Sequence, residues 1–252
     1  MKRKFSCRRD TLTIRGHIWG EPGQNRTVII LSHGFLADEH MCYPYAKYLA
    51  EKGYTAVTYD FCGGGLRTKS DGRTRDMTVL TEKKDLEAVI RAVKTLLSPK
   101  KIFLFGCSQG GFVSALTAVE LGREEISGLI LFYPALCIPD DARRGKMMFY
   151  RFDPESIPDL LGKYPMKLGG DYARTVIHMD PYKAMGGYNG PVLLLHGTAD
   201  PIVDISYSRR LKKIYSLCRY VELAGAGHGF SGKRDKQACE YLGRYMKVTA
   251  GF

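Results

Sequence analysis

Short apolar segments alternate with longer amphipathic segments along most of the chain. The short segments are rich in aliphatic and β-branched residues, often without a polar interruption, which is typical of strands covered on both faces of a parallel sheet. They occupy residues 27–32, 55–60, 101–106, 128–133, 192–196 and 219–223, after an N-terminal strand or hairpin near 11–19. Helical spacing of apolar residues predicts helices at 41–52, 78–97, 110–121, 205–215 and 233–246. This alternation predicts an α/β fold with a mostly parallel, doubly covered sheet.

Residues 135–188 break the alternation. They contain the aromatic cluster Phe149, Tyr150 and Phe152, and the prolines Pro139, Pro154, Pro158 and Pro165. A structureless loop of this length is improbable inside a compact domain. We therefore expect an inserted cap of short helices or a hairpin at 135–188, carried by a core formed from 1–134 and 189–252.

The composition is that of an ordinary globular protein. The chain has 252 residues, of which 44% are hydrophobic and 25% charged. The first ten residues are basic, but the apolar run of a secretory signal does not follow them, and no later stretch is long and apolar enough to span a membrane. A cytoplasmic protein without a membrane span is the expectation. Seven cysteines without a CxxC pair favour reduced thiols, and because Cys and His are not clustered at ligand spacing, no metal or organic cofactor is expected.

The net charge of +12 raises the question of a nucleic-acid partner. The basic residues are scattered along the chain and are not interleaved with exposed aromatics, as a nucleic-acid footprint would require. A solvated basic surface is therefore favoured and no nucleic acid is expected as a partner. A homodimer is left open.

The strongest single signal is the segment KIFLFGCSQGG at residues 101–111. An apolar strand runs directly into a turn with Ser108 at its centre, and a helical pattern follows. A nucleophile on such a strand-to-helix turn needs small residues two positions before and after it, and Gly106 and Gly110 supply them. The segment predicts that Ser108 is a nucleophile rather than part of a glycine-rich structural turn.

A serine hydroxyl needs a general base in hydrogen-bond reach, and a histidine in that role is held in one tautomer by a carboxylate. In this architecture the three occur in the order Ser, acid, His, on loops that follow strands. Asp200 follows the strand at 192–196, and His228 follows the strand at 219–223 between small residues. We predict these two as acid and base.

Other residues compete for both roles. Asp204 is the nearest rival acid, but it precedes a predicted helix, where an aspartate is useful for capping alone. Asp60 is expected to stabilise a loop. Among the histidines, His33 and His196 are expected to brace loops, and His178 lies in the cap.

Attack on an ester carbonyl creates an oxyanion that must be met by main-chain N–H donors. One comes from the residue after the nucleophile, which is Gln109, and the other from the loop after an early strand. The segment HGF at residues 33–35 follows such a strand, and Phe35 is predicted to present the second donor. The alternative is that HGF is an ordinary tight turn.

Together, HGF, GCSQGG, HGTADPIV and GAGHGF resemble the motifs of bacterial feruloyl and cinnamoyl esterases of the α/β-hydrolase superfamily, over nearly the whole chain. The resemblance implies the α/β-hydrolase fold and the same assignment of nucleophile, acid, base and oxyanion donors. Segments of the insertion also look like that family's cap. It further implies that Asp141 and Tyr172 bind the aromatic hydroxyls of the acyl group.

These observations predict a serine esterase that works through an acyl-enzyme on small-molecule esters of hydroxycinnamate type. Three alternatives share the catalytic set and differ in the pocket: a monoacylglycerol lipase, a general carboxylesterase and a thioesterase. A fourth, from another class, is a catalytically silent protein that uses the hydrolase pocket to bind a ligand.

Overall fold

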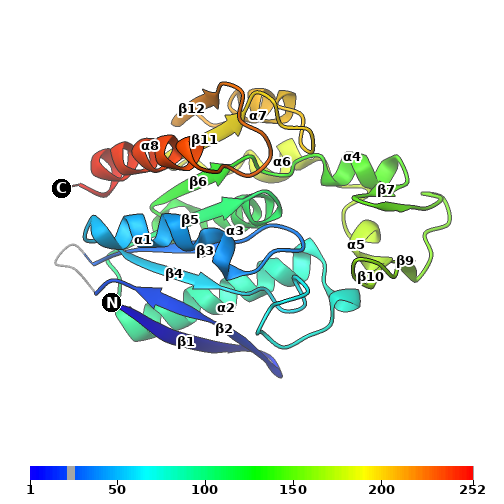
Figure 1. The fold of residues 1–252 in the computed structure, drawn as a ribbon, viewed down its shortest axis with the longest axis horizontal. Coiled ribbons are helices and arrows are strands. Elements are labelled where there is room, and N and C mark those ends of the chain that lie inside the picture. Colours follow the sequence, from blue (N-terminus) through cyan, green and yellow to red (C-terminus); the bar gives the residue numbers. More distant parts are fainter. Residues whose placement is uncertain (22–25, 252) are drawn as a thin grey trace.

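The main sheet runs through the whole molecule (Figure 1). The computed structural model describes residues 1–21 and 26–251, and within them this sheet has eight strands in the order β1-β2-β4-β3-β5-β6-β11-β12. The strands are β1 (Lys2–Arg9), β2 (Leu12–Trp19), β3 (Thr27–Ser32), β4 (Thr55–Tyr59), β5 (Lys101–Cys107), β6 (Gly128–Phe132), β11 (Val192–Gly197) and β12 (Cys218–Leu223). The pairs β1–β2 and β2–β4 are antiparallel, and all pairs from β4 to β12 are parallel. The predicted fold class is confirmed.

Burial along the strands follows their place in the sheet. Strands β3, β4, β6 and β11 are buried at every residue, because helices cover both of their faces. The edge strands β1 and β12 are partly exposed. Strand β1 precedes the predicted N-terminal range, and its exposed Lys2, Lys4 and Arg8 interrupt the apolar pattern. Charged residues on an edge strand disfavour pairing with another chain.

The longer helices cover both faces of the sheet. Helices α1 (Tyr43–Glu51) and α8 (Lys233–Ala250) pack on one face, and α2 (Val79–Leu97) and α3 (Gln109–Glu125) on the other (Figure 1). Helix α2 begins where expected, because the Thr78 hydroxyl accepts a hydrogen bond from the N–H of Thr81. Helix α7 (Ser206–Leu211) is shorter than predicted, and the 3₁₀ turn η1 (Glu39–Cys42) precedes α1.

The segment 135–188 contains short elements. They are α4 (Ile138–Arg143), β7 (Lys146–Met147), β8 (Tyr150–Arg151), β9 (Leu160–Gly162), β10 (Leu168–Gly169), α5 (Asp171–Arg174) and α6 (Pro181–Met185). Strand pairs β7–β8 and β9–β10 are antiparallel. In Figure 1, α4, β7, α5, β9 and β10 lie at the end of the sheet toward which the arrowheads of β5 and β6 point, which is where loops after parallel strands gather. The division into core and cap stays a prediction.

Candidate active site

Ser108 lies at the turn between β5 and α3 with φ 53° and ψ −119°. This backbone conformation is strained for a residue with a side chain. The close packing of strand and helix needs both flanking glycines: a Cβ on Gly106 would lie 2.2 Å from the carbonyl oxygen of Gly110, and one on Gly110 2.3 Å from that of Ser32. The turn therefore projects the Ser108 hydroxyl out of the packed sheet into a cavity.

His228 lies between Ser108 and Asp200. Its Nε2 atom is 3.0 Å from Ser108 Oγ, and its Nδ1 atom is 2.8 Å from Asp200 Oδ2. Because the carboxylate only accepts hydrogen bonds, Nδ1 carries the proton and Nε2 is free to accept the Ser108 O–H. The three predicted residues are thus brought together in the arrangement that allows a serine to be deprotonated as it attacks.

Asp200 is held by three further contacts. Its Oδ1 accepts hydrogen bonds from the N–H groups of Ile202 and Val203, both at 2.9 Å. Its Oδ2 lies 3.2 Å from Nε2 of the buried His196, whose Nδ1 contacts Ser208 Oγ at 2.7 Å. Burial would raise the pKa of Asp200, but hydrogen bonds with His196 and His228 outweigh it, so the pKa lies well below its ordinary value. Asp200 is therefore ionised and fixed in orientation.

The competing residues have other partners. Asp204 accepts a hydrogen bond from the N–H of Ser206, the first residue of α7, although the N-cap position itself is occupied by Ile205. Asp60 accepts hydrogen bonds from the N–H groups of Glu39 and Lys69, which ties two loops together. His33 braces the loop after β3, because its Nε2 accepts from the N–H of Phe61 and its Nδ1 contacts the carbonyl oxygen of Gly34.

Phe35 and Gln109 both line the cavity next to Ser108. Gly34 allows the close approach, since a Cβ there would lie 3.2 Å from the Ser108 Cβ. Within residues 1–21 and 26–251, the main-chain N–H groups of Phe35 and Gln109 donate no backbone hydrogen bond. Two such donors beside a nucleophile can stabilise the negative oxygen that forms during attack.

The cavity above Ser108 has a volume of about 310 Å³. Its walls are mostly apolar, and they include residues that sequence reasoning did not single out for the site: Met41, Ala135, Cys137, Ile138, Lys146, Met147, Met148, Phe149, Ile202 and Val203. Four of them belong to the stretch GKMMFYRF at residues 145–152, and its adjacent methionine and aromatic residues were the available signal. Most of the wall therefore comes from the insertion and from the loop after β11.

Asp141 and Tyr172, predicted to bind substrate, also line this cavity. Burial raises the pKa of Asp141, although a hydrogen bond with the Cys137 thiol opposes the change. Tyr172 is buried, and its hydroxyl donates a hydrogen bond to the side-chain Oε1 of Gln109. Their binding of a substrate stays a prediction.

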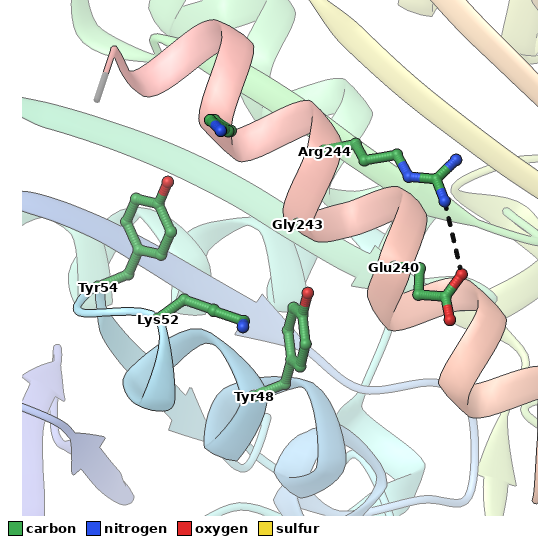
Figure 2. Close-up of a pocket in the computed structure, with 7 residues that line it drawn as sticks. Tyr48, Lys52, Tyr54, Glu240, Gly243 and Arg244 are labelled. Atoms are coloured by element: carbon green, nitrogen blue, oxygen red, sulfur yellow. Dashed lines mark ion pairs between the residues drawn. The ribbon is translucent and has the colours of Figure 1, made fainter.

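A larger cavity, of about 460 Å³, lies between α1 and α8 on the opposite face of the sheet from α2 and α3 (Figure 2). Tyr48, Lys52 and Tyr54 line it from one side, and Glu240 and Arg244, 3.6 Å apart, from the other. Among the residues that the structure describes, its lining contains no serine, cysteine or histidine, the residue types predicted for nucleophile and base. Within the described ranges, no cluster of His, Cys, Asp and Glu could hold a metal ion, and no helix could cross a membrane.

Comparison with known proteins agrees with this fold. The curated relatives include the "Uncharacterized peptidase YtmA" of Bacillus subtilis, 28% identical over 58% of this chain and 55% of that protein, and the "Alpha/beta hydrolase domain-containing protein 17C" of Xenopus tropicalis, 27% identical over 82% and 57%. The chain thus spans little more than half the length of these relatives. Among solved structures, Est1E from Butyrivibrio proteoclasticus with bound ferulic acid has a TM-score of 0.90 and 28% identity, covering 98% of this chain and all of that one.

These findings confirm the α/β-hydrolase assignment and the resemblance to feruloyl esterases. They support a hydrolase and leave the specificity open. Residues 23–174, more than half of the chain, match the family described as "Serine aminopeptidase, S33". The chain belongs to this serine aminopeptidase S33 family of the α/β-hydrolases.

Proposed function

We propose that the protein is a serine carboxylic-ester hydrolase that acts through an acyl-enzyme and prefers esters of hydroxycinnamate-like acids. The observation that carries the esterase proposal is the position of His228, within hydrogen-bond reach of both Ser108 Oγ and Asp200 Oδ2. Nucleophilic acyl transfer needs three parts: a serine on a strained turn, a histidine whose Nε2 can accept the serine proton, and a carboxylate that is fixed in orientation.

In the first half of the reaction Ser108 Oγ attacks the ester carbonyl carbon and its proton passes to Nε2 of His228. The N–H groups of Phe35 and Gln109 stabilise the negative oxygen of the tetrahedral intermediate. The bond to the alcohol then breaks, and His228 returns the proton to the leaving oxygen. Asp200 stays ionised throughout and stabilises the imidazolium that forms in between.

In the second half, water attacks the acyl-enzyme carbonyl carbon and gives a proton to His228. The bond between the carbonyl carbon and Ser108 Oγ breaks, and His228 returns the proton to Ser108. The acid leaves and the free enzyme is restored. Because the same residues act in both halves of the reaction, the loss of any one of them should slow acylation and deacylation alike.

Two observations support an aromatic, hydroxylated acyl group. Est1E, which binds ferulic acid, aligns with nearly all of this chain. The cavity wall also carries one half-buried carboxyl group, that of Asp141, among apolar side chains. A partly buried polar group discriminates strongly between a ligand that hydrogen-bonds to it and one that does not.

The test compares methyl 4-hydroxycinnamate with methyl cinnamate, which lacks only the phenol hydroxyl. The wild-type protein should prefer the hydroxylated ester. Asp141→Asn should lower kcat/KM for it about tenfold while leaving methyl cinnamate within twofold, because a neutral amide oxygen accepts a weaker hydrogen bond from the phenol than a carboxylate does. Asp171→Asn, an exposed carboxylate on α5, is the matched control. Equal losses on both esters, or none, would refute the phenol contact.

One observation favours a second candidate, a general carboxylesterase or monoacylglycerol lipase. The cavity wall contains Met41, Met147 and Met148, flexible apolar side chains that adapt to aliphatic acyl chains. A higher kcat/KM on p-nitrophenyl octanoate than on either cinnamate would favour this candidate. Preferential cleavage of amino-acid p-nitroanilides would instead favour a peptidase.

A further inference from the structure

Glu82 lies on the face of α2 that packs against the core, and its side chain is completely buried. Its Oε2 atom accepts a hydrogen bond from the side-chain Nε2 of Gln109 at 2.7 Å. The other end of that amide, Oε1, accepts a hydrogen bond from the Tyr172 hydroxyl. Three buried polar side chains from α2, α3 and α5 thus form one chain of hydrogen bonds that ends beside Ser108.

Packing alone does not account for a carboxyl group at this position. Burying a polar group costs free energy unless hydrogen bonds compensate, and an aliphatic residue would fill the same site without that cost. The other buried carboxyl group of α2 has a structural explanation: Asp85 contacts the side chain of Arg9 and accepts from the N–H of Cys62. Glu82 has no such cation, and its hydrogen bond among the described residues goes to Gln109.

The hydrogen-bonded network of Glu82, Gln109 and Tyr172 contacts both residues expected to form the oxyanion hole. Gln109 directly follows Ser108 and is the first residue of α3, so fixing its side chain restricts the main-chain N–H at the same Cα atom. Tyr172 also packs its ring against that of Phe35, with 5.6 Å between the ring centroids. Oxyanion donors act through preorganisation, so small changes in their orientation reduce the stabilisation of the transition state.

We propose that Glu82 is a positioning residue for the reaction: with Tyr172 it clamps the side chain of Gln109 and so aims the N–H of that residue at the developing oxyanion. This inference rests on the proposed ester hydrolysis but not on the proposed acyl group. It also gives Tyr172 a role with every substrate, because its hydroxyl is bound to Gln109 whether or not the acyl group carries a phenol.

The test uses p-nitrophenyl acetate, whose acyl group is too small to need the cap. Glu82→Gln keeps an oxygen that can accept from Gln109, whereas Glu82→Met removes it with little change in length. We expect Glu82→Met to lower kcat five- to tenfold with KM within twofold, the scale of one lost hydrogen bond, and Glu82→Gln to keep kcat within twofold. Val89→Ala, a cavity-forming change at a buried position of the same helix, should lower the melting temperature without lowering kcat.

A second readout does not require turnover. A fluorophosphonate that reacts with Ser108 also places an oxygen in the oxyanion hole, so its second-order labelling rate should fall in Glu82→Met by the same factor as kcat and recover in Glu82→Gln. The inference is overturned if Glu82→Met stays within twofold of wild type in both readouts, if Glu82→Gln falls as far as Glu82→Met, or if KM changes in place of kcat. A wild-type protein that neither hydrolyses the acetate nor reacts with the phosphonate would overturn the proposed function as well.

Discussion

Replacing Glu82 by glutamine should raise the free energy of unfolding, relative to wild type, increasingly as pH rises. In the unfolded chain a glutamate loses its proton near pH 4.3. In the folded protein, burial raises the pKa of Glu82 well above its ordinary value, and the neighbouring Asp85 adds to the shift. Between these two values the folded state holds one proton more than the unfolded state, so the free energy of unfolding falls as pH rises.

The size of the effect follows from this difference of one proton. The contribution of Glu82 to the free energy of unfolding is fully present below about pH 4.3. Above that pH it is lost at about 1.4 kcal/mol per pH unit, until the pH reaches the folded-state pKa of Glu82. Glutamine does not titrate. The free energy of unfolding of Glu82→Gln relative to wild type should therefore rise by up to about 1.4 kcal/mol between pH 5 and pH 6.

Urea unfolding at pH 5 and pH 6, at one ionic strength, measures this change. Trp19 is the single tryptophan and supplies a fluorescence signal. Other titrating groups, Asp85 among them, are present in both proteins and largely cancel in the comparison. A difference between the two proteins that does not change with pH would refute the reasoning, because it would mean that Glu82 holds the same number of protons folded and unfolded.

Two further predictions concern the proposed catalytic residues. Ser108→Ala should lower kcat by several orders of magnitude and abolish fluorophosphonate labelling, without lowering the melting temperature. If this variant retained a tenth of the wild-type activity, Ser108 would be excluded as the nucleophile. Asp200→Asn should lower kcat by up to about 10⁴-fold, because an amide at this position favours the wrong tautomer of His228. Asp204→Asn should stay within a fewfold of wild type, and a larger loss there than at Asp200 would show that the carboxylates were assigned in the wrong order.

The sequence predicted the central strands well, and with them the proximity of Ser108, Asp200 and His228, for one physical reason. Strands buried on both faces must be apolar throughout, so β3, β5 and β11 stand out without further information. Parallel strands also bring their carboxyl ends to one edge of the sheet, so residues that follow β5, β11 and β12 are expected to meet. For that reason His228 lies 3.0 Å from Ser108 Oγ and 2.8 Å from Asp200 Oδ2.

The sequence predicted the edges and the insertion less well. Strand β1 has five exposed residues out of eight, so its hydrophobic signal is weak. The elements of the insertion are two to six residues long, too short to show a period of 2.0 or 3.6. Which of their side chains turn toward Ser108 depends on contacts between segments that are distant in sequence, such as Tyr172 and Gln109, which are 63 residues apart.

Glu82 shows that a signal for the positioning network was present in the sequence. The apolar stripe of α2 includes Val79, Leu86 and Val89, and position 82 falls on the same face, three residues after the first and four before the second. A carboxyl group at a core position of an amphipathic helix is costly unless something binds it, so it predicts a buried polar partner. The partner could not be named from the sequence, because Gln109 was assigned for its main-chain N–H alone. The structure joins the two, and the side chain of the residue after the nucleophile then has a reason to be an amide. Its NH2 group donates to Glu82 while its oxygen accepts from Tyr172, and no aliphatic side chain can do either.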